Sequence, residues 1–361
     1  MECVLIGLRR AGKTTVFNIL AGPEHEVHLT DGASSHIVSV QVPDPHFEEL
    51  YRRFAPPKCV RNTLLIKDTP PVGTKETEKT KGLTERELQF ISSADTLILV
   101  ARCFSETGEE MPSPVEDTQS LWEELVLSDL LKAESRLEKI EKTVSKVSGT
   151  EKEQMETELA ALKKVINALQ EGKGARVAPL DQIEEKAIRG FLFLTQKPIL
   201  VVANVGENDI GNESNYIALF QAIKGMEAAH LCVLCGKIES EIAQLDEDTR
   251  RIFLQDYGLK NPARTNLIHA CYATCDLITF YTINEKELHA WAIPQGTPAL
   301  TAAGMIHSDF EKGFIRAEVI DWKALIDAGG HTEARKKGFL RTEGKQYAVR
   351  DGEVINFLFK V

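Results

Sequence analysis

An eight-residue motif near the amino terminus reads Gly7-Leu8-Arg9-Arg10-Ala11-Gly12-Lys13-Thr14. It fits the pattern G-x-x-x-x-G-K-[ST], which is typical of phosphate-binding loops, or P-loops. The apolar residues 3–6 before it predict a buried strand, and residues 15–20 after it have helical character. A P-loop needs this order of strand, glycine-containing loop and helix, so a chance glycine turn is the weaker interpretation.

The residue types of this motif predict its chemistry. Gly7 and Gly12 allow a tight turn in which successive backbone N–H groups face one concavity, and the helix N-terminus adds partial positive charge. Lys13 is expected to reach the β- and γ-phosphates of a nucleotide, and the Thr14 hydroxyl to bind the Mg²⁺ that bridges them. We therefore predict Lys13 and Thr14 as catalytic residues. The predicted nucleotide-binding residues of the loop are Gly7, Leu8, Arg9, Arg10, Ala11, Gly12, Lys13, Thr14 and Thr15.

Two arginines lie inside the loop. Arg9 and Arg10 either add positive charge around the phosphates or are solvated on the outer face of the loop. The second alternative is favoured, because surface charges are usually solvated.

Further polar residues follow other predicted strands. Residues 63–68 form a strand-like run that ends in Asp68, and an acid at this place holds the metal ion in P-loop proteins. Two later apolar strands lead into Asn204-Val205-Gly206-Glu207 and Cys235-Gly236-Lys237. Ligands of open α/β sheets bind at the carboxyl ends of the strands. We therefore expect Thr14 and Asp68 to bind Mg²⁺ at the sheet edge that also carries the other two segments.

The composition excludes several classes of protein. The chain has 361 residues, of which 43 are Lys or Arg and 54 are Asp or Glu, and its formal net charge is -11. At roughly 100–200 residues per domain, this length predicts two or three domains. No stretch approaches the roughly 20 apolar residues of a membrane span, and no signal peptide is evident, so we expect a cytoplasmic protein without a membrane partner. The acidic balance also disfavours nonspecific nucleic-acid binding.

A helical segment is predicted in the middle of the chain. Apolar residues recur at alternating steps of 3 and 4 from Leu130 to Val147 and again from Met155 to Leu169. This spacing predicts two coiled-coil-like helices joined by a short turn, an antiparallel hairpin. The hairpin is either an arm that contacts a large partner or a self-contained structural element, and the helix pattern does not distinguish the two.

Residues from about 278 onward predict a separate small domain. Strand-like runs at 278–282 and 290–293 flank a polar turn, and residues 299–306 are a helix candidate. This segment carries eleven acidic and eleven basic residues, so the rest of the chain carries the whole net charge. A neutral module is more compatible with an RNA-rich surface than the acidic body is.

Together these motifs resemble the Obg-like ATPases, also called the YchF proteins, over nearly the whole chain. Besides the P-loop, the resemblance rests on Val42-Pro43-Asp44-Pro45, Arg102-Cys103-Phe104, Asn204-Val205-Gly206-Glu207 and Lys237-Ile238-Glu239-Ser240-Glu241. The most specific run is residues 303–320, AGMIHSDFEKGFIRAEVI. The resemblance implies an α/β fold with three parts. These are a Ras-like P-loop NTPase domain over 1–120 and 190–277, an inserted α-helical coiled-coil hairpin over 121–189, and a C-terminal β-grasp (TGS) domain over 278–361.

The resemblance also implies a preference for one base. GTPases of this class carry Asn-Lys-x-Asp, whose Asp accepts hydrogen bonds from guanine, whereas this chain has Val205 and Glu207 at the second and fourth positions. The longer carboxylate misplaces the acceptor, so we expect ATP to bind more tightly than GTP. By analogy, Asn204, Val205 and Glu207 line the adenine side, and the loop beside the base is Cys235, Gly236 and Lys237. Alternatively, Glu207 is a solvated acid at a helix start.

Three positions near the γ-phosphate depart from the family. The family has Asp-x-x-Gly where this chain has Asp68-Thr69-Pro70-Pro71, and Pro71 lacks the N–H that bonds the γ-phosphate. The loss of a comparable donor costs about 2.7–4 kcal/mol. The histidine proposed to serve hydrolysis aligns with Met111, whose thioether cannot orient water as an imidazole does. The switch threonine falls near Gly32, with three possible substitutes: Thr30, Ser34 and Ser35. We therefore predict intact binding and slow turnover.

The sequence supports three hypotheses about function. The first is an ATPase that binds ATP and Mg²⁺, hydrolyses ATP slowly to ADP and phosphate, and acts as a ribosome-associated switch in translation. The ribosome as partner is implied by the resemblance alone. The second is a nucleotide-sensing binding module with little hydrolysis, and the third is a GTPase that prefers GTP. In each case we expect a monomer.

Overall fold

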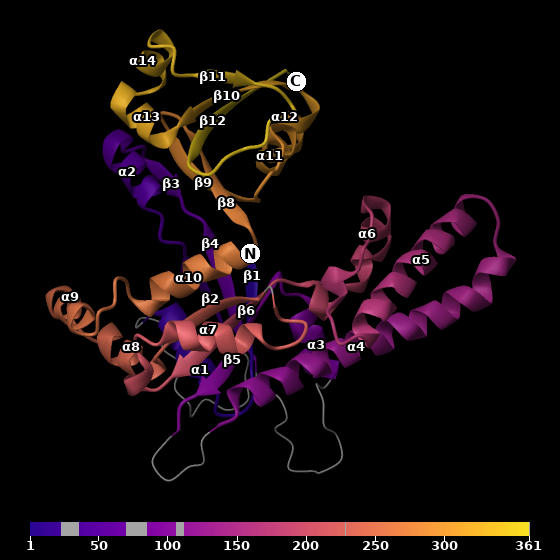
Figure 1. The fold of residues 1–361 in the computed structure, drawn as a ribbon. Coiled ribbons are helices and arrows are strands. Elements are labelled where there is room, and N and C mark those ends of the chain that lie inside the picture. Colours follow the sequence, from indigo (N-terminus) through magenta and orange to yellow (C-terminus); the bar gives the residue numbers. More distant parts are fainter. Residues whose placement is uncertain (23–35, 70–84, 106–111, 228, 361) are drawn as a thin grey trace. The chain divides into compact units, whose positions relative to one another are not determined.

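The computed structural model describes residues 1–22, 36–69, 85–105, 112–227 and 229–360. The chain divides into two compact units (Figure 1). Unit 1 comprises Met1–Val40 and Leu65–Cys271, and unit 2 comprises Gln41–Leu64 and Tyr272–Val361. Within the described ranges, no helix is both long enough and apolar enough to cross a membrane.

Unit 1 is built on a six-stranded sheet. Its strand order is β2-β4-β1-β5-β6-β7, and β1 pairs in parallel with β4 and β5, β5 with β6, and β6 with β7. The strands span β1 Glu2–Ile6, β2 His36–Gln41, β4 Thr63–Asp68, β5 Thr96–Cys103, β6 Ile199–Val205 and β7 His230–Leu234. Because these neighbours are parallel, the carboxyl ends of β1, β4, β5, β6 and β7 meet at one edge. The sequence predicted its site residues at the ends of four of these strands.

Helices cover this sheet. The apolar core joins strand residues such as Val4, Leu99 and Val201 to Leu125 and Ile238 of the surrounding helices. The α-helices span α1 Lys13–Ala21, α3 Glu85–Ser92, α4 Pro114–Thr143, α5 Thr150–Gln170, α6 Gln182–Ile188, α7 Glu213–Gln221, α8 Gly236–Ala243, α9 Glu247–Asp256 and α10 Ala263–Thr274. Short 3₁₀ turns span η2 Val144–Lys146, η3 Ala175–Val177, η4 Arg189–Phe191, η5 Leu194–Gln196 and η6 Glu207–Asp209.

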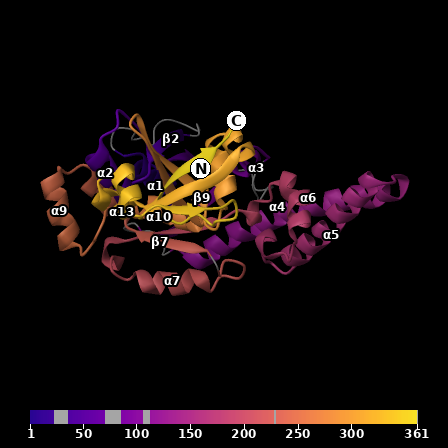
Figure 2. The same ribbon diagram turned by 90° about the horizontal axis from the view of Figure 1, so that it is seen from above.

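Helices α4 and α5 form the predicted hairpin, which extends beyond the sheet in both views of Figures 1 and 2. Buried Ala133 and Ile140 of α4 and Leu162 of α5 lie in its seam. Arg136 also pairs with Glu158 across the seam, at 2.7 Å between Nε and Oε1. The structure therefore confirms the inserted hairpin, but α4 begins at Pro114, well before the periodic pattern that predicted it.

Unit 2 is built on a second six-stranded sheet, in the order β11-β10-β12-β8-β9-β3. It is mixed: β10 is antiparallel to β11 and β12, and β8 to β9, whereas β12 is parallel to β8 and β3 to β9. The strands span β3 Lys58–Val60, β8 Leu277–Ile283, β9 Glu287–Pro294, β10 Phe314–Asp321, β11 Arg341–Glu343 and β12 Glu353–Phe359. The helices span α2 Pro45–Phe54, α11 Ala299–Ile306, α12 Ser308–Lys312, α13 Trp322–Ala328 and α14 His331–Lys336.

The segment Gln41–Leu64 belongs to unit 2, although the sequence analysis placed it in the nucleotide-binding domain. Phe47 of α2 is buried in one apolar cluster with Leu288 and Leu325, and β3 extends the sheet beside β9. Asp44 caps α2 by accepting a hydrogen bond from the Phe47 N–H at 3.0 Å, and it also accepts one from the Tyr281 hydroxyl at 2.8 Å. The contacts with Leu288, Leu325 and Tyr281 are long-range and have no signature in the local sequence.

Candidate nucleotide-binding site

The P-loop connects the end of β1 to the start of α1. Gly12 is the residue before α1, and its φ of 90° is in the left-handed region that favours glycine. A Cβ added at Gly12 would lie 2.2 Å from Nδ2 of Asn204, and one added at Gly7 would lie 2.7 Å from the carbonyl oxygen of Val100. Both glycines of the motif are therefore required by close packing, and Gly12 also by its backbone conformation.

Lys13 is buried at the start of α1, with 5% of its surface exposed. Its Nζ donates a hydrogen bond to the carbonyl oxygen of Gly7 at 2.8 Å. Burial lowers the pKa of Lys13 to about 8, while the nearby carboxylates of Asp68 and Glu87 act in the opposite direction. A buried ammonium group without full compensation gains from an anionic ligand, because a phosphate supplies the missing negative charge.

Asp68 ends β4 and faces Thr14. The Thr14 hydroxyl donates to Oδ2 of Asp68 at 3.3 Å. The other oxygen, Oδ1, is buried and has no hydrogen-bond partner in the described part of the chain. Burial raises the pKa of Asp68, opposed by the charge of Lys13 and the Thr14 hydrogen bond.

These oxygens fit the Mg²⁺ ion that the fold implies. Mg²⁺ prefers carboxylate, hydroxyl and phosphate oxygens, and a buried carboxylate oxygen without a partner indicates where a cation would be held. The described ranges contain no group of three or more His, Cys, Asp and Glu side chains that could hold a metal ion by themselves. A site of one carboxylate and one hydroxyl therefore needs nucleotide phosphates to complete it, which is the usual way that Mg²⁺ binds beside a nucleotide.

Asn204 joins three segments at the end of β6. Its Nδ2 donates to the carbonyl oxygen of Ala11 at 3.2 Å, and its Oδ1 accepts from the Gly236 N–H at 3.0 Å. The side chain is buried. A Cβ at Gly236 would lie 2.9 Å from Cγ2 of Thr15, so the P-loop and the start of α8 are closely packed here. Asn204 therefore positions the P-loop against the segment predicted to lie beside the base.

A cavity of about 760 Å³ lies next to Asn204, within the usual size range of ligand pockets. It contains all the residues that the sequence predicted around the base. Its lining residues are Thr15, Phe104, Ser105, Asn204, Val205, Gly206, Glu207, Asn208, Cys235, Gly236, Lys237 and Ser240. Phe104 and Ser240 were not predicted as site residues. Phe104 follows the carboxyl end of β5, so the strand-end rule that selected its neighbours would have found it.

The residues predicted at the base differ in environment. Val205 is buried in the apolar core of unit 1, and Cys235 is buried, which raises the pKa of its thiol. Glu207 and Lys237 are exposed, with 45% and 70% of their side chains accessible. They form an ion pair at 2.6 Å between Oε1 and Nζ. One oxygen of the Glu207 carboxylate is therefore already engaged by Lys237.

Some of the predicted P-loop residues line a second hollow. The positions behind the prediction of slow turnover lie outside the described residues. Leu8, Arg9 and Ala11 line a hollow of about 560 Å³ with residues of β5 and α4. The side chains of Arg9 and Arg10 are exposed. The positions on which slow turnover was predicted lie outside the described residues; they are Thr30, Gly32, Ser34, Ser35, Pro71 and Met111.

One polar contact beside Asp68 was not predicted. The Thr69 hydroxyl donates to the carbonyl oxygen of Leu5 at 2.6 Å and is buried. It fixes the end of β4 against β1, next to the P-loop. The only sequence signal for this contact is a hydroxyl-bearing residue directly after Asp68, the acid that ends the strand.

The fold and the sequence both have relatives among known proteins. A family model described as YchF-GTPase_C, a protein of unknown function (DUF933), matches residues 277–360. The YchF GTPase of Schizosaccharomyces pombe has the same fold, with a TM-score of 0.81 and 23% identity over 99% of this chain and 97% of that one. A GTP binding protein from Pyrococcus horikoshii OT3 also shares the fold, with a TM-score of 0.58 and 16% identity over 100% of both chains.

Bacterial relatives match over the full length. The ribosome-binding ATPase YchF of Bacillus subtilis is 34% identical over 367 residues, which cover 99% of this chain and 98% of the relative. The protein of the same name from Pasteurella multocida is 35% identical over 366 residues, which cover 100% of this chain and 99% of the relative. Identity at this level over whole chains, together with the shared fold and the matched C-terminal segment, shows that this chain belongs to the YchF family.

Proposed function

We propose that this chain is a Mg²⁺-dependent ATPase that associates with the ribosome. The two bacterial relatives described above are named ribosome-binding ATPases, and the two solved structures described above are named for GTP. The choice of ATP and the rate of hydrolysis therefore need support from this chain's own residues.

The observation that carries the proposal is the arrangement of Lys13, Thr14 and Asp68. The buried ammonium group of Lys13 lies on the P-loop, and Oδ1 of Asp68 at the end of β4 is buried and has no hydrogen-bond partner among the described residues. Mg²⁺, when bound there, would supply positive charge that neutralises the phosphates. Lys13 would donate to the β- and γ-phosphate oxygens, Thr14 would turn its hydroxyl oxygen toward the cation, and Asp68 would present Oδ1. The loop amides and the start of α1 would hold the phosphate chain in place.

The base end supports ATP over GTP. Selective binding of guanine needs a carboxylate that accepts hydrogen bonds from its N1 and N2 atoms. Glu207 is the carboxylate at this place, and its Oε1 is already bonded to Lys237. Adenine binding does not need a carboxylate acceptor at this place. The cavity beside Asn204 therefore has room for a purine base and does not favour guanine over adenine.

We propose that ATP is hydrolysed slowly, because the sequence lacks two groups that assist hydrolysis. Pro71 provides no N–H for the γ-phosphate, and Met111 provides no imidazole to orient water. Positioning and charge stabilisation carry almost all catalysis of phosphoryl transfer, so a site that keeps its binding residues and lacks these two groups binds well and hydrolyses slowly.

Single-turnover hydrolysis tests this proposal. We expect saturating Mg²⁺-ATP to be hydrolysed faster on the protein than in buffer, and Asp68→Asn to remove the Mg²⁺-dependent rate. Asp256→Asn, which makes the same change at an exposed residue of α9, is the matched control and should keep the rate. Competition with GTP should give weaker binding of GTP. Co-sedimentation with purified ribosomes, with a non-hydrolysable ATP analogue and with ADP, tests the partner.

Each alternative gives a different result. A wild-type rate equal to that of buffer, with binding intact, would make the chain a nucleotide-sensing module. Tighter binding of GTP would make it a GTPase and would overturn the interpretation of Glu207. No pelleting with ribosomes in either nucleotide state would remove the ribosome from the proposal.

A further inference from the structure

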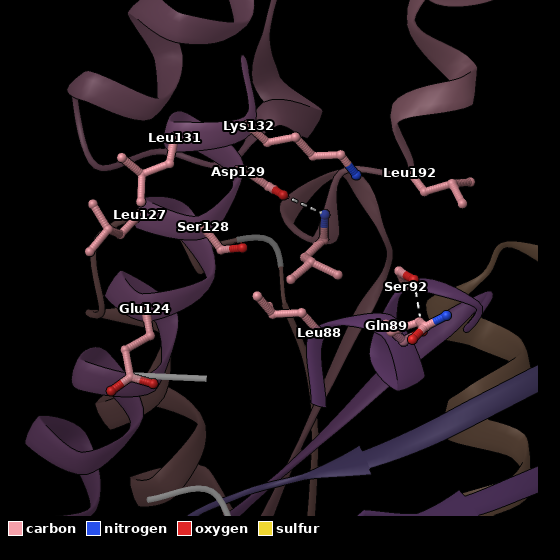
Figure 3. A pocket seen from close by; sticks show the side chains of 11 residues that line it. Leu88, Gln89, Ser92, Glu124, Leu127, Ser128, Asp129, Leu131, Lys132 and Leu192 are labelled. Atoms are coloured by element: carbon pink, nitrogen blue, oxygen red, sulfur yellow. Dashed lines mark hydrogen bonds between the residues drawn. The ribbon is translucent and has the colours of Figure 1, made fainter. Parts of the chain in front are cut away.

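A further hollow in unit 1 is lined by none of the residues predicted to bind nucleotide. Its volume is about 540 Å³, and it is lined by α3, α4 and the segment around η4 and η5. Five of its eleven lining residues are leucines, namely Leu88, Leu127, Leu131, Leu192 and Leu194. Figure 3 shows Leu127 and Leu131 on one side of the hollow and Leu192 on the other. We call this hollow the leucine groove.

The leucines at its rim face solvent. Leu127 is 54% exposed, Leu131 is 60% exposed and Leu192 is 50% exposed. Leu127 and Leu131 are four residues apart in α4, so they lie on one face of that helix, while the opposite face carries buried residues such as Leu125 and Ala133. A row of large apolar side chains at the mouth of a hollow is typical of an interaction surface.

The backbone also holds one of these leucines in an unfavourable conformation. Leu192 has φ 50° and ψ 49°, in the left-handed region that residues with a Cβ rarely adopt. Its side chain gains little burial in return, because half of it is exposed. This conformation ends the turn η4, where the Leu192 N–H donates to the carbonyl oxygen of Arg189 at 3.4 Å, and it leaves the side chain at the mouth of the groove.

The charged groups of the groove differ in whether they have partners. Asp129 accepts hydrogen bonds from the Leu194 N–H at 2.9 Å and from the Thr195 N–H at 2.8 Å, and Lys132 donates to the carbonyl oxygen of Phe191. In contrast, Oε2 of Glu124 is buried and has no hydrogen-bond partner in the described ranges. Burial raises the pKa of Glu124, and the nearby acid Glu87 raises it further.

The unpartnered acid and the leucines lie along one face of α4. Glu124, Leu127, Ser128 and Leu131 follow the spacing i, i+3, i+4 and i+7, so the carboxylate stands at one end of the apolar row. This arrangement fits a cation at one end and apolar side chains beside it. It disfavours nucleic acid, because the phosphate backbone is anionic and the groove offers carboxylates and leucines.

We infer that the leucine groove binds an amphipathic helix of a partner protein, with apolar side chains between Leu127, Leu131 and Leu192 and a Lys or Arg against Glu124. A partner helix presents apolar residues at i, i+3, i+4 and i+7, and the groove offers a complementary row. Glu124 lines the groove, so a cation of the docked helix would face its carboxylate. This inference does not depend on the proposed ATPase activity.

Selection of helical peptides by the full-length protein tests the inference. The probe is a phage library of helical peptides in which the positions of one face and of the adjoining turn are randomised. We expect the selected peptides to share apolar residues at helical spacing and a Lys or Arg one turn beyond them. Binding is then measured by fluorescence anisotropy with synthetic copies of the selected peptides.

Three variants distinguish specific binding in the groove from nonspecific binding to exposed apolar residues. Leu131→Ser should weaken binding by about tenfold or more, because a buried leucine contact is lost. Glu124→Gln should weaken it about fivefold, because a charge-assisted hydrogen bond becomes a neutral one. Ile183→Ser is the matched control: Ile183 is an exposed apolar residue of α6 that does not line the groove, and its replacement should change nothing.

Four results would overturn the inference. These are a selection that yields no peptide, selected peptides without a basic residue, an equal loss of binding in Ile183→Ser, and self-association through the groove. Sedimentation velocity examines the last of these. We expect a wild-type monomer, whereas a dimer that Leu131→Ser dissociates would show that a second copy of this chain occupies the groove.

Discussion

The two ends of the candidate nucleotide site differ in how well their charges are satisfied. At the phosphate end, Lys13 and Asp68 are buried, both have displaced pKa values, and one oxygen of Asp68 has no partner in the described part of the chain. At the base end, Glu207 and Lys237 are exposed and paired with each other. Charges interact strongly where water is excluded and weakly where it is present. We therefore expect affinity to come from the phosphates and base selectivity to be modest.

The largest expected effect is at Lys13. Lys13→Met keeps the aliphatic stem and removes the ammonium group, so the charge-assisted hydrogen bonds to the phosphates are lost. At about 1.5–3 kcal/mol for a hydrogen bond to a charged group, we expect ATP to bind about a hundredfold more weakly. Isothermal titration calorimetry measures this, and circular dichroism checks that the variant is folded.

Comparison with Lys237→Ala sharpens this result. That variant removes an equal charge from the exposed end of the same site, and it should bind ATP nearly as the wild type does. Equal losses in the two variants would mean that net charge, rather than burial at the P-loop, determines affinity.

The next largest effect is the dependence of affinity on pH. Burial lowers the pKa of Lys13 to about 8, and the protonated form is the one that binds phosphate. Below pH 8 Lys13 already carries its proton in the free protein, so it does not make the affinity for ATP depend on pH there. Above pH 8 the free protein must take up a proton on binding, so the affinity for ATP should fall by up to about tenfold per pH unit.

Calorimetry in buffers with different ionisation enthalpies measures this proton uptake. With EDTA present, so that metal binding does not contribute, we expect uptake to approach one proton per ATP above pH 8. Lys13→Met should abolish it. Binding without proton uptake up to pH 9.5 would contradict the assignment to Lys13.

The phosphate end could be predicted from sequence far better than the arrangement around it. A P-loop is contiguous, and its glycines, lysine and threonine have fixed roles, so Gly12 and Lys13 lie where the motif requires. The role of Asn204 could not be derived from its own segment, because its two partners, Ala11 and Gly236, are distant in sequence. The placement of Gln41–Leu64 in unit 2 depends on apolar contacts of Phe47 with the C-terminal sheet, for which no local pattern exists.

A smaller effect is expected at Asn204, which connects the two ends. Asn204→Ala leaves the Ala11 carbonyl and the Gly236 N–H without this buried partner, so unfolding should require about 2 kcal/mol less free energy. The P-loop and the start of α8 should also lose their fixed spacing, and ATP should bind about tenfold more weakly. Urea denaturation and calorimetry measure the two effects.

Asn208→Ala provides the control for this change. It removes an exposed amide from the same cavity, and both its stability and its affinity should match those of the wild type. If Asn204→Ala weakens binding but leaves stability unchanged, the residue contacts the nucleotide directly and does not act as a positioning residue.

The smallest expected effect concerns the choice of base. Lys237→Ala releases Glu207, whose carboxylate then becomes available to guanine N1 and N2. Because the ion pair is exposed, its free energy is at most about 1 kcal/mol, so the ratio of GTP to ATP affinity should rise by less than about fivefold. Adding Glu207→Gln to this variant should return the ratio to its wild-type value, since the amide cannot replace the lost anionic acceptor. If the ratio is the same in all three proteins, base selectivity arises from the backbone of the two loops, and the ion pair at the rim has no part in it.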